Sequence, residues 1–438
     1  MSMEVRTRFA PSPTGAMHIG SVRTALYAYL VAKKNKGIFT LRIEDTDQAR
    51  LVEGATEDII KTLKWLGLNF EGEVEYQSKR KETYKEYVEK LIKEEKAYEK
   101  EGAIWFKINT EGKTSIEDLV GPRTIEIPNN EQKDFVILKS DGFPTYHLAH
   151  VVDDHLMETN PVIRGPEWIS SLPKHIQLFT SFGWEVARYA HIPVILGPDK
   201  SKLSKRHGAK AASEFRKEGF LPEAILNYMA FLGWTPPSGK EILSVTEMAE
   251  EFDLKDVHVS NPVFDITKLN WMNGEYIRKA SDEDLLNRVD EFLDYISEGE
   301  LKNTKYEDKE KLKKIIPLVK ERIKTLSEFI PMTDFLFDKP EYENKEFDKL
   351  KIPDLKLALE KIQEKLESLE KPWKADAFEK TFRQLAEELK ISVSQMFQLL
   401  RVAVSGQSVT PPLFESIEIL GSDETISRLK QAISVVAP

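Results

Sequence analysis

Two polar segments of this 438-residue chain combine residue types that can bind phosphate. The first comprises residues 14–21 (TGAMHIGS), between a short apolar run and a run with helical spacing. A helix N-terminus is positively polarised, the imidazole of His18 can donate a hydrogen bond, and Gly20 allows close approach to the backbone. These features suit an ATP phosphate. A glycine turn whose histidine only shapes the loop is the alternative interpretation.

The second segment comprises residues 202–206 (KLSKR), in a loop that follows a predicted late strand. Lys202 and Lys205, with a serine between them, can stabilise the negative charge on a departing pyrophosphate. A solvated basic loop is the simpler explanation of this pentamer in isolation.

Together, the two segments resemble the HIGH and KMSKS signatures of the class I aminoacyl-tRNA synthetases. Their order along the chain fits, although Ser21 replaces the last His of the first signature and Arg206 replaces the last Ser of the second. The resemblance implies catalytic roles for His18, Lys202 and Lys205. It also implies a wider set of ATP contacts: His18, Gly20, Glu167, Ile195, Leu196, Lys202, Leu203, Ser204, Lys205 and Arg206.

Further motifs resemble one branch of that class, the glutamyl and glutaminyl enzymes. They are residues 6–15 (RTRFAPSPTG), 41–47 (LRIEDTD), 144–155 (PTYHLAHVVDDH) and 162–165 (VIRG). Two more, residues 261–265 (NPVFD) and 269–274 (LNWMNG), resemble the bacterial-type glutamyl enzymes. The resemblance covers essentially the whole chain and is strongest up to about residue 280.

The implied substrate agrees with charged residues at predicted strand ends. Glutamate carries one ammonium and two carboxylates, so its pocket needs an anion and guanidinium groups. Glu44 can pair with the ammonium, and Arg8 and Arg164 can pair with the carboxylates. A surface ion pair at a strand end is the alternative for each arginine. The resemblance places all three in the glutamate pocket with Ala10, Ser12, Tyr146 and His150.

His150 departs from the family, which carries Asn or Val at this position. Contact with the substrate and a place in the pocket wall are equal alternatives for it. The reaction implied by the family is attack of glutamate on ATP with Mg²⁺, followed by transfer to the 2′-hydroxyl of tRNA-Glu. Catalysis then consists of positioning and charge stabilisation. Whether tRNA-Gln is charged as well stays open.

These residues need a scaffold that brings strand ends together. Residues 5–9 and 38–43 are predicted strands, and the apolar residues from Ser21 onward follow helical spacing, with Gly37 as the C′ residue of that helix. This is half of a doubly wound α/β unit, whose ligands bind beyond the carboxyl ends of the strands.

After residue 78 the predicted helices and strands continue this α/β unit, with one run of consecutive strands inserted in it. A helix is predicted near residues 79–97, followed by strands at 104–108, 123–127 and 135–138 that suggest a small antiparallel insertion. Helices at 146–152 and 167–182 alternate with strands at 162–164 and 192–196, and Pro222 begins another helix. From about residue 281, Lys/Glu-rich amphipathic helices alternate with Pro-containing breaks.

The predicted fold class is therefore α/β: a Rossmann-like class I synthetase catalytic domain with a small α+β insertion, then all-α stem-contact and anticodon-binding domains. We expect the catalytic domain in residues 1–83 and 144–200, and the insertion that binds the acceptor end in 84–143. The stem-contact domain that carries the KLSKR loop is expected in 201–283, and the helical anticodon-binding region in 284–438.

The composition bears on two questions: whether the protein binds zinc and in which cell compartment it is expected. The chain has no Cys, so it has neither disulfides nor a thiolate zinc site, although many bacterial glutamyl enzymes carry a zinc-binding Cys cluster in the insertion. We therefore expect no zinc, and an insertion shorter than is usual in the family. With no apolar run of membrane-spanning length and no secretory or transit signal, we expect a cytoplasmic monomer. The net charge of −10 permits only a local basic track for nucleic acid.

The sequence leaves four alternative functions to compare with this one. A glutaminyl synthetase shares the early motifs but has a β-barrel anticodon region, whereas this tail is predicted to be helical. A glutamyl-queuosine enzyme resembles only the catalytic half, and small-molecule nucleotidyltransferases lack the helical tail. A catalytically silent tRNA-binding paralogue is disfavoured because His18, Lys202, Lys205, Arg8 and Glu44 are all present.

Overall fold

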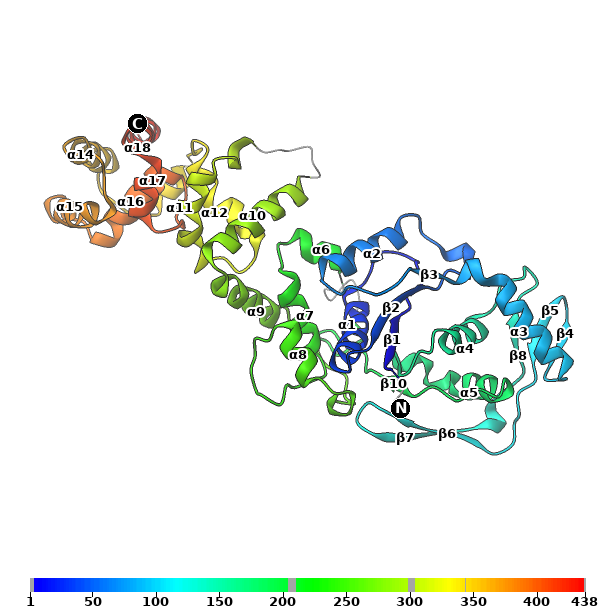
Figure 1. Ribbon diagram of the computed structural model, residues 1–438. Coiled ribbons are helices and arrows are strands. Elements are labelled where there is room, and N and C mark those ends of the chain that lie inside the picture. The colour runs from blue at the N-terminus through cyan, green and yellow to red at the C-terminus, as the bar shows by residue number, and fades with distance from the viewer. Residues whose placement is uncertain (1–3, 204–209, 298–303, 343, 437–438) are drawn as a thin grey trace. The chain divides into compact units, whose positions relative to one another are not determined.

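The computed structural model describes residues 4–203, 210–297, 304–342 and 344–436 (Figure 1). The chain forms two compact units. The first comprises Met1–Arg216 and Leu221–Met272, and the second Lys217–Phe220 and Asn273–Pro438. The domain boundaries expected at residues 83, 143, 200 and 283 stay predictions. In the part of the chain that the structure describes, no helix has both the length and the apolar character needed to cross a membrane.

The first unit begins with the predicted strand–helix–strand motif. Strand β1 (Arg6–Phe9) pairs in parallel with β2 (Ile38–Ile43), and β2 pairs with the short β3 (Glu75–Tyr76). Helix α1 (Ile19–Lys34) packs on β1 and β2 and buries Val22, Leu26 and Leu30. Ten of its sixteen residues are buried, because residues 222–231 and 245–251 also pack against it.

The expected role of Gly37 as C′ residue is wrong. Helix α1 ends with Asn35 as C-cap, and Lys36 occupies the left-handed C′ position with a φ of +53°. The Lys36 and Gly37 amides donate to the carbonyls of Lys33 and Ala32 at 3.1 and 2.9 Å, as in a Schellman motif. Gly37 is needed for space, because a Cβ there would lie 2.0 Å from the carbonyl oxygen of Val5.

A second sheet has the strand order β7-β6-β10-β9. Strands β9 (Val162–Arg164), β10 (Tyr189–His191) and β6 (Lys113–Asp118) are parallel, and β7 (Arg123–Pro128) returns antiparallel beside β6. The predicted strand at residues 192–196 is wrong. Strand β10 ends at His191, two residues before Pro193, which has no N–H to continue a ladder.

A third sheet, β4-β5-β8, is antiparallel and lies within residues 84–143, where the insertion was predicted. It contains β4 (Ala97–Lys100), β5 (Ala103–Phe106) and β8 (Phe135–Leu138). Helix α3 (Lys81–Lys93) ends before the predicted residue 97, because Glu95 takes a left-handed conformation and β4 begins. Strand β7 was expected in this sheet but joins the second one through β6.

The insertion has no core of its own. Buried side chains of α3, β5 and β8 form one hydrophobic cluster with α4 (Tyr146–Leu156) and α5 (Leu172–Ser181). Between β9 and α5, residues Pro166–Ser171 form a 3-10 helix, η4, where the sequence predicted regular helix. The remaining helices that lie wholly in the first unit are α2 (Ala55–Trp65), α7 (Pro222–Phe231) and α8 (Val245–Glu251), and Pro222 begins α7 as predicted.

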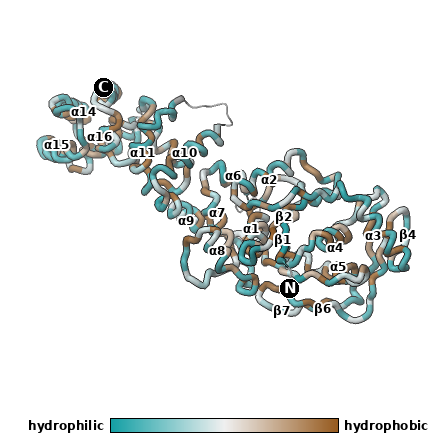
Figure 2. The backbone as a smooth tube through the Cα atoms, viewed as in Figure 1, coloured by the Kyte–Doolittle hydropathy of each residue, from teal (hydrophilic) through white to brown (hydrophobic). Residues whose placement is uncertain are grey.

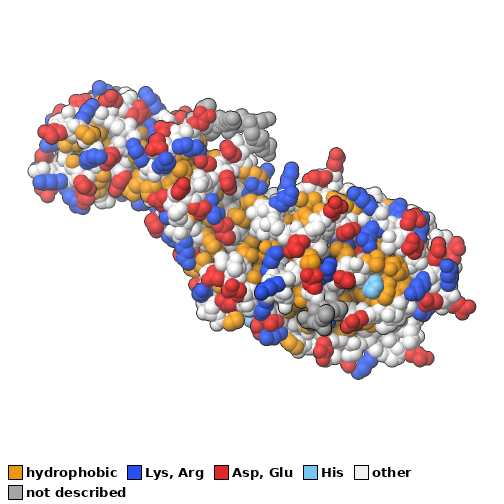
Figure 3. Space-filling view, in the orientation of Figure 1, with side chains coloured by type: hydrophobic (Ala, Val, Ile, Leu, Met, Phe, Trp, Pro, Cys, Tyr) orange, Lys and Arg blue, Asp and Glu red, His pale blue; other side chains and the backbone are white. Residues whose placement is uncertain are grey.

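Helices α6 (Ala212–Lys217) and α9 (Ile266–Lys279) cross the division between the units. The second unit is helical throughout its described residues. It contains α10 (Asp282–Ile296), α11 (Lys309–Lys320), α12 (Phe329–Thr333), α13 (Asn344–Asp348), α14 (Leu355–Glu367), α15 (Ala375–Glu388), α16 (Val393–Ser405), α17 (Leu413–Leu420) and α18 (Ser422–Val436). Hydrophilic and hydrophobic residues alternate along these helices (Figure 2). Helices α14–α18 bury a shared core. Lys and Arg are intermixed with Asp and Glu on the surface that Figure 3 shows.

Candidate active site

A pocket of about 500 Å³ in the first unit gathers most of the predicted ATP-binding residues. Its lining combines the start of α1, the β9–η4 connection and the chain after β10. The predicted residues in this lining are His18, Gly20, Glu167, Ile195, Lys202 and Leu203. Leu196 is not in the lining, because its backbone pairs with Lys202 and with Val263. Ser204, Lys205 and Arg206 lie outside the described residues.

The start of α1 has the properties expected of a phosphate site. His18 is the N-cap residue, in an extended conformation with φ −71° and ψ 150°, and its side chain is exposed. The first turn of α1 contains no acidic residue, so its positive polarisation is not offset there. A phosphate can therefore approach the backbone at Gly20 and the imidazole of His18 together.

Arg23, one turn into α1, is a lining residue that the sequence interpretation missed. It is buried, and it donates to the carbonyl oxygens of Leu232 and Pro193. These bonds fasten α1 to the end of α7 and to the chain that follows β10. Gly165 makes room on the opposite side, since a Cβ there would lie 2.3 Å from the carboxylate of Glu167.

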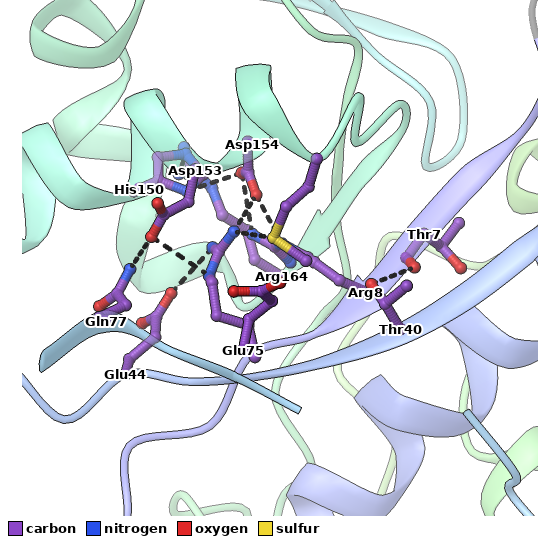
Figure 4. A network of polar contacts seen from close by, with 12 residues as sticks. Thr7, Arg8, Thr40, Glu44, Glu75, Gln77, His150, Asp153, Asp154 and Arg164 are labelled. Carbon is purple, nitrogen blue, oxygen red and sulfur yellow. Dashed lines mark hydrogen bonds and ion pairs between the residues drawn. The ribbon is translucent and has the colours of Figure 1, made fainter. Parts of the chain in front are cut away.

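Two of the predicted glutamate-binding residues, Arg8 and His150, contact one buried carboxylate, that of Asp154 in α4 (Figure 4). Arg8 donates from Nε and Nη2 to its two oxygens at 3.0 and 3.2 Å. Arg42 donates from Nη1 to Asp154 Oδ1 at 2.7 Å and from Nη2 to Glu44 Oε1 at 3.0 Å. His150 Nδ1 lies 2.9 Å from Asp154 Oδ2. Residues from β1, β2 and α4 are thus held as one charged cluster.

Arg164, at the end of β9, has a different environment. Its Nε donates to His191 at 3.1 Å, and its Nη1 contacts His150 and His175 at 3.2 and 3.0 Å. Its Nη2 donates to the carbonyl oxygen of Trp168 at 3.3 Å. In the described part of the chain, no carboxylate lies within ion-pair distance of Arg164. Its guanidinium is therefore hydrogen-bonded but not neutralised by any described carboxylate.

Aromatic rings cover this cluster. Tyr146 stacks on Trp168 with 3.8 Å between ring centroids, and on His150 with 5.4 Å between them. His150 itself is fully buried beneath Tyr146. Tyr146 itself is half-buried.

The remaining predicted glutamate contacts, Ala10 and Ser12, lie in the loop after β1. The Glu44 amide donates to the Pro11 carbonyl oxygen at 2.9 Å, which holds this loop against the end of β2. Ala10 is half-buried and Ser12 is exposed. Their backbone is therefore placed beside Glu44.

Burial and charge determine the protonation of this cluster. Burial raises the pKa of Asp154, but the guanidinium groups of Arg42 and Arg8 outweigh it and hold that pKa well below its usual value. Burial dominates for Glu44 and raises its pKa despite Arg42 and Arg8. Burial lowers the pKa of His150 to about 3, so this imidazole is neutral near pH 7.

The sequence interpretation assigned no role to four buried residues of this region: Arg42, Asp153, Asp154 and His191. Asp153 is fully buried and accepts hydrogen bonds from Gln77 and Tyr84 at 2.8 and 2.7 Å. A signal was available: two adjacent acids end an apolar helical run, and a buried carboxylate requires partners. The partners themselves lie too far along the chain to be paired from the sequence.

No group of three or more His, Asp or Glu residues that could hold a metal ion occurs within residues 4–203, 210–297, 304–342 and 344–436. The expected absence of zinc stays a prediction from the missing Cys residues.

Comparison with known families matches nearly the whole chain. Residues 4–103 and 99–271 match the catalytic domain of the class I tRNA synthetases (E and Q), and residues 284–433 match an anticodon binding domain. The two catalytic matches meet at residues 99–103, in the turn between β4 and β5. The predicted order of an α/β catalytic region and a helical anticodon-binding region is thereby confirmed.

Curated relatives are also similar to this chain over nearly its whole length. A glutamate–tRNA ligase of Dehalococcoides mccartyi is 40% identical, and the alignment covers 99% of each chain. A glutamate–tRNA ligase 2 of Thermoanaerobacter pseudethanolicus is 39% identical over 99% of this chain and 98% of its own. The first alignment spans 489 positions against 438 residues here, so about fifty positions of that relative have no counterpart in this chain.

Solved structures agree. The crystal structure of a glutamate tRNA ligase from Elizabethkingia meningosepticum, in complex with its amino acid, superposes with a TM-score of 0.85. It is 32% identical and covers 99% of this chain and 100% of its own. A glutamate-tRNA synthetase from Elizabethkingia anophelis superposes with a TM-score of 0.81 at 32% identity.

Proposed function

The chain belongs to the class I tRNA synthetases for glutamate and glutamine, and we propose that it uses ATP to ligate L-glutamate to tRNA-Glu. One observation carries this function: the similarity to glutamate–tRNA ligases extends over 99% of the chain and includes both the catalytic and the anticodon-binding regions. A modification enzyme or small-molecule transferase would match the catalytic half alone. A glutaminyl enzyme would have a β-barrel tail, whereas the described residues of this tail are helical.

The first step activates glutamate. An oxygen of its α-carboxylate attacks the α-phosphorus of ATP, the bond to the β-phosphate oxygen breaks, and pyrophosphate leaves with that electron pair. His18 and the N-terminus of α1 would hold phosphate oxygens, and Lys202 would offset the charge that develops on pyrophosphate. We assign the same role to Lys205 from the sequence motif.

Mg²⁺ would accompany ATP and neutralise phosphate charge. Among the described lining residues of the ATP pocket, Glu167 is the one carboxylate. An ion brought in with ATP would therefore depend mainly on phosphate oxygens and water, as Mg²⁺ commonly does in nucleotide sites.

Glutamate recognition would use the groups that remain available around the Asp154 cluster. A guanidinium has five N–H donors. Arg8 uses three of them on Asp154 and the Ile163 carbonyl, and Arg164 uses four on three imidazoles and the Trp168 carbonyl. Arg8 would thus offer two N–H groups to substrate carboxylates, and Arg164 would offer one.

The ammonium would be met by Glu44, whose side chain is 9% exposed and whose carboxylate pairs with Arg42 on one side. A cation close to Glu44 favours its ionised form and opposes the effect of burial. Tyr146 would form the wall, with Ala10 and Ser12 contributing backbone, and His150 would act from beneath Tyr146 through Arg164. Glutamine should be rejected because its neutral amide leaves a guanidinium charge unpaired.

The second step transfers glutamate to tRNA. The 2′-hydroxyl of the terminal adenosine attacks the carbonyl carbon of the mixed anhydride, and AMP leaves. We propose that the second unit, with its anticodon-binding match, selects the tRNA.

The decisive experiment is ATP-dependent charging of purified tRNA-Glu with glutamate and with glutamine in parallel. We expect glutamate to be attached and glutamine to be attached at least a hundredfold less efficiently, as judged by kcat/KM. A preference for glutamine would overturn the function. Purified tRNA-Gln in the same assay decides whether the enzyme discriminates between the two tRNAs.

A further inference from the structure

We propose that Asp118 and His191 form a positioning pair that orients Arg164 for glutamate binding and leaves its positive charge without a directly paired carboxylate. This inference rests on the proposed function, because it assigns a role to residues behind the proposed glutamate site. Neither residue touches the substrate in our interpretation. Both act through Arg164.

Strand register brings the three residues into line. Asp118, His191 and Arg164 are the last residues of β6, β10 and β9, which are neighbours in one sheet. His191 and Arg164 are register partners, and Tyr189 is the register partner of Asp118. All three side chains are almost completely buried, with exposures of 1%, 1% and 5%. The guanidinium also packs over the Tyr189 ring, 4.5 Å from its centroid.

The donor chemistry of arginine determines how the imidazole must be protonated. A guanidinium can only donate, so the His191 Nε2 that lies 3.1 Å from Arg164 Nε must be the acceptor. A neutral imidazole then carries its hydrogen on Nδ1, which faces Asp118 Oδ2 at 3.1 Å. Asp118 therefore selects the tautomer that Arg164 needs.

The other oxygen of Asp118 is fully occupied. Oδ1 accepts the backbone N–H groups of His191 and Val120 at 3.0 and 3.1 Å. An asparagine at this position must keep its oxygen there, because its NH₂ group cannot accept these two donors. The NH₂ group would then face His191 Nδ1 and force the hydrogen onto Nε2, so that two donors would oppose each other at Arg164.

The same arrangement explains why the charge of Arg164 is not neutralised within the protein. Three imidazoles and one carbonyl hold its donors, so the guanidinium is oriented without being neutralised. A carboxylate placed directly against Arg164 would orient it equally well but would compete with the substrate. Interposing His191 keeps the charge of Asp118 one ring away from the arginine.

The test compares four single variants and one double variant with the wild-type enzyme by steady-state charging of tRNA-Glu. Asp118→Asn preserves shape and changes the tautomer, and His191→Leu removes the acceptor. His191→Gln retains a neutral acceptor that is independent of Asp118. Arg123→Gln is the matched control, because Arg123 Nη2 contacts the same Asp118 Oδ2 at 3.4 Å but does not reach His191.

We expect Asp118→Asn and His191→Leu to raise the KM for glutamate about ten- to a hundredfold, since a hydrogen bond to a charged group is lost. The KM for ATP should change less than about threefold. His191→Gln and Arg123→Gln should both leave the KM for glutamate within about threefold of the wild type. Adding Asp118→Asn to His191→Gln should have little further effect, because the tautomer no longer exists.

Nitrogen-15 NMR of the histidine rings provides a readout that does not depend on activity. The His191 signal should indicate the Nδ1–H form in the wild type and the Nε2–H form in Asp118→Asn. Wild-type KM values for glutamate in both His191→Leu and Asp118→Asn would overturn the positioning role. Equal increases in the KM for glutamate and for ATP would also overturn it. Failure of the wild-type enzyme to charge glutamate would instead refute the proposed function.

Discussion

Arg8 and Asp154 are separated by 146 residues in the sequence, yet Arg8 donates to both carboxylate oxygens of Asp154, at 3.0 and 3.2 Å. The pair joins β1, which begins the catalytic region, to α4 in its second half. The same carboxylate also accepts from Arg42 at 2.7 Å. One fully buried acid therefore fixes two arginines and the ends of two strands.

Replacing Asp154 should damage both stability and substrate binding. Asp154→Asn leaves Arg8 buried without its anion, whereas Arg42 keeps Glu44 and Asp153. Breaking a buried ion pair in this way typically costs about 3–5 kcal/mol. The free energy of unfolding, measured with urea, should fall by that amount. Asp141→Asn is a control, because Asp141 is an exposed carboxylate paired with Lys139, and its effect should stay below about 1 kcal/mol. A loss below 1 kcal/mol in Asp154→Asn would contradict the central role of this carboxylate.

Stability should decline below neutral pH because buried histidines resist protonation. Burial lowers the pKa of His147 to about 4 and that of His150 to about 3, from an ordinary value of 6.5. Between these values the unfolded chain binds protons that the folded chain does not, so stability falls as the pH falls. The cost is about 1 kcal/mol per histidine between pH 7.5 and 5.5.

Urea unfolding at these two pH values tests the effect. His147→Gln should remove about 1 kcal/mol of the loss. His258→Gln should remove none, since His258 is exposed. The carboxyls of Glu44 and Asp153 act in the opposite sense, because burial raises their pKa values. Identical pH slopes for wild type and His147→Gln would show that His147 is protonated normally in the folded state.

Removing the charge of Lys202 should slow turnover more than it weakens ATP binding. If Lys202 acts on the developing charge of pyrophosphate, Lys202→Gln should lower kcat about tenfold or more and change the KM for ATP by only a few-fold. Lys200→Gln is the neighbouring control, because Lys200 is exposed and is not part of the pocket lining. A raised KM for ATP with an unchanged kcat would make Lys202 a ground-state contact.

Charging should depend on the anticodon if the second unit selects tRNA. The full-length enzyme should charge tRNA-Glu with an exchanged anticodon at least tenfold less efficiently, because base contacts carry sequence information. Phosphate contacts should add a salt dependence common to both tRNAs. Equal kcat/KM for the native and exchanged tRNAs would refute anticodon reading by residues 284–433 and would favour a modification enzyme.

The end of α1 offers a test of the fold. Gly37→Ala should destabilise the protein by roughly 1–3 kcal/mol, because a methyl group would collide with the Val5 carbonyl. Lys36→Gly should stabilise it by up to about 1 kcal/mol, since Lys36 has a φ of +53°. The opposite order of stabilities in thermal unfolding would return the C′ role to Gly37.

The sequence alone predicted a strand or helix correctly where the prediction depended on a few neighbouring residues. Strands 38–43 and 162–164 and the helix start at Pro222 were predicted correctly, because apolar runs and proline act over a few neighbouring residues. The motifs around His18, Arg8, Glu44 and Arg164 were sufficient to indicate the family. Strand 192–196 failed where Pro193 overrode an apolar run.

Tertiary structure alone decided which charges meet. Arg8 requires Asp154, and His191 requires Asp118 across 73 residues, and these pairs depend on strand order and register. No local pattern states that β6 lies beside β10, or that His191 faces Arg164. A buried charge must find its partner through space, whereas a sequence orders residues along the chain. The sequence therefore determined which charged side chains stand at the predicted strand ends, and packing determined that Arg164 alone among the described buried arginines of this cluster keeps an unpaired charge.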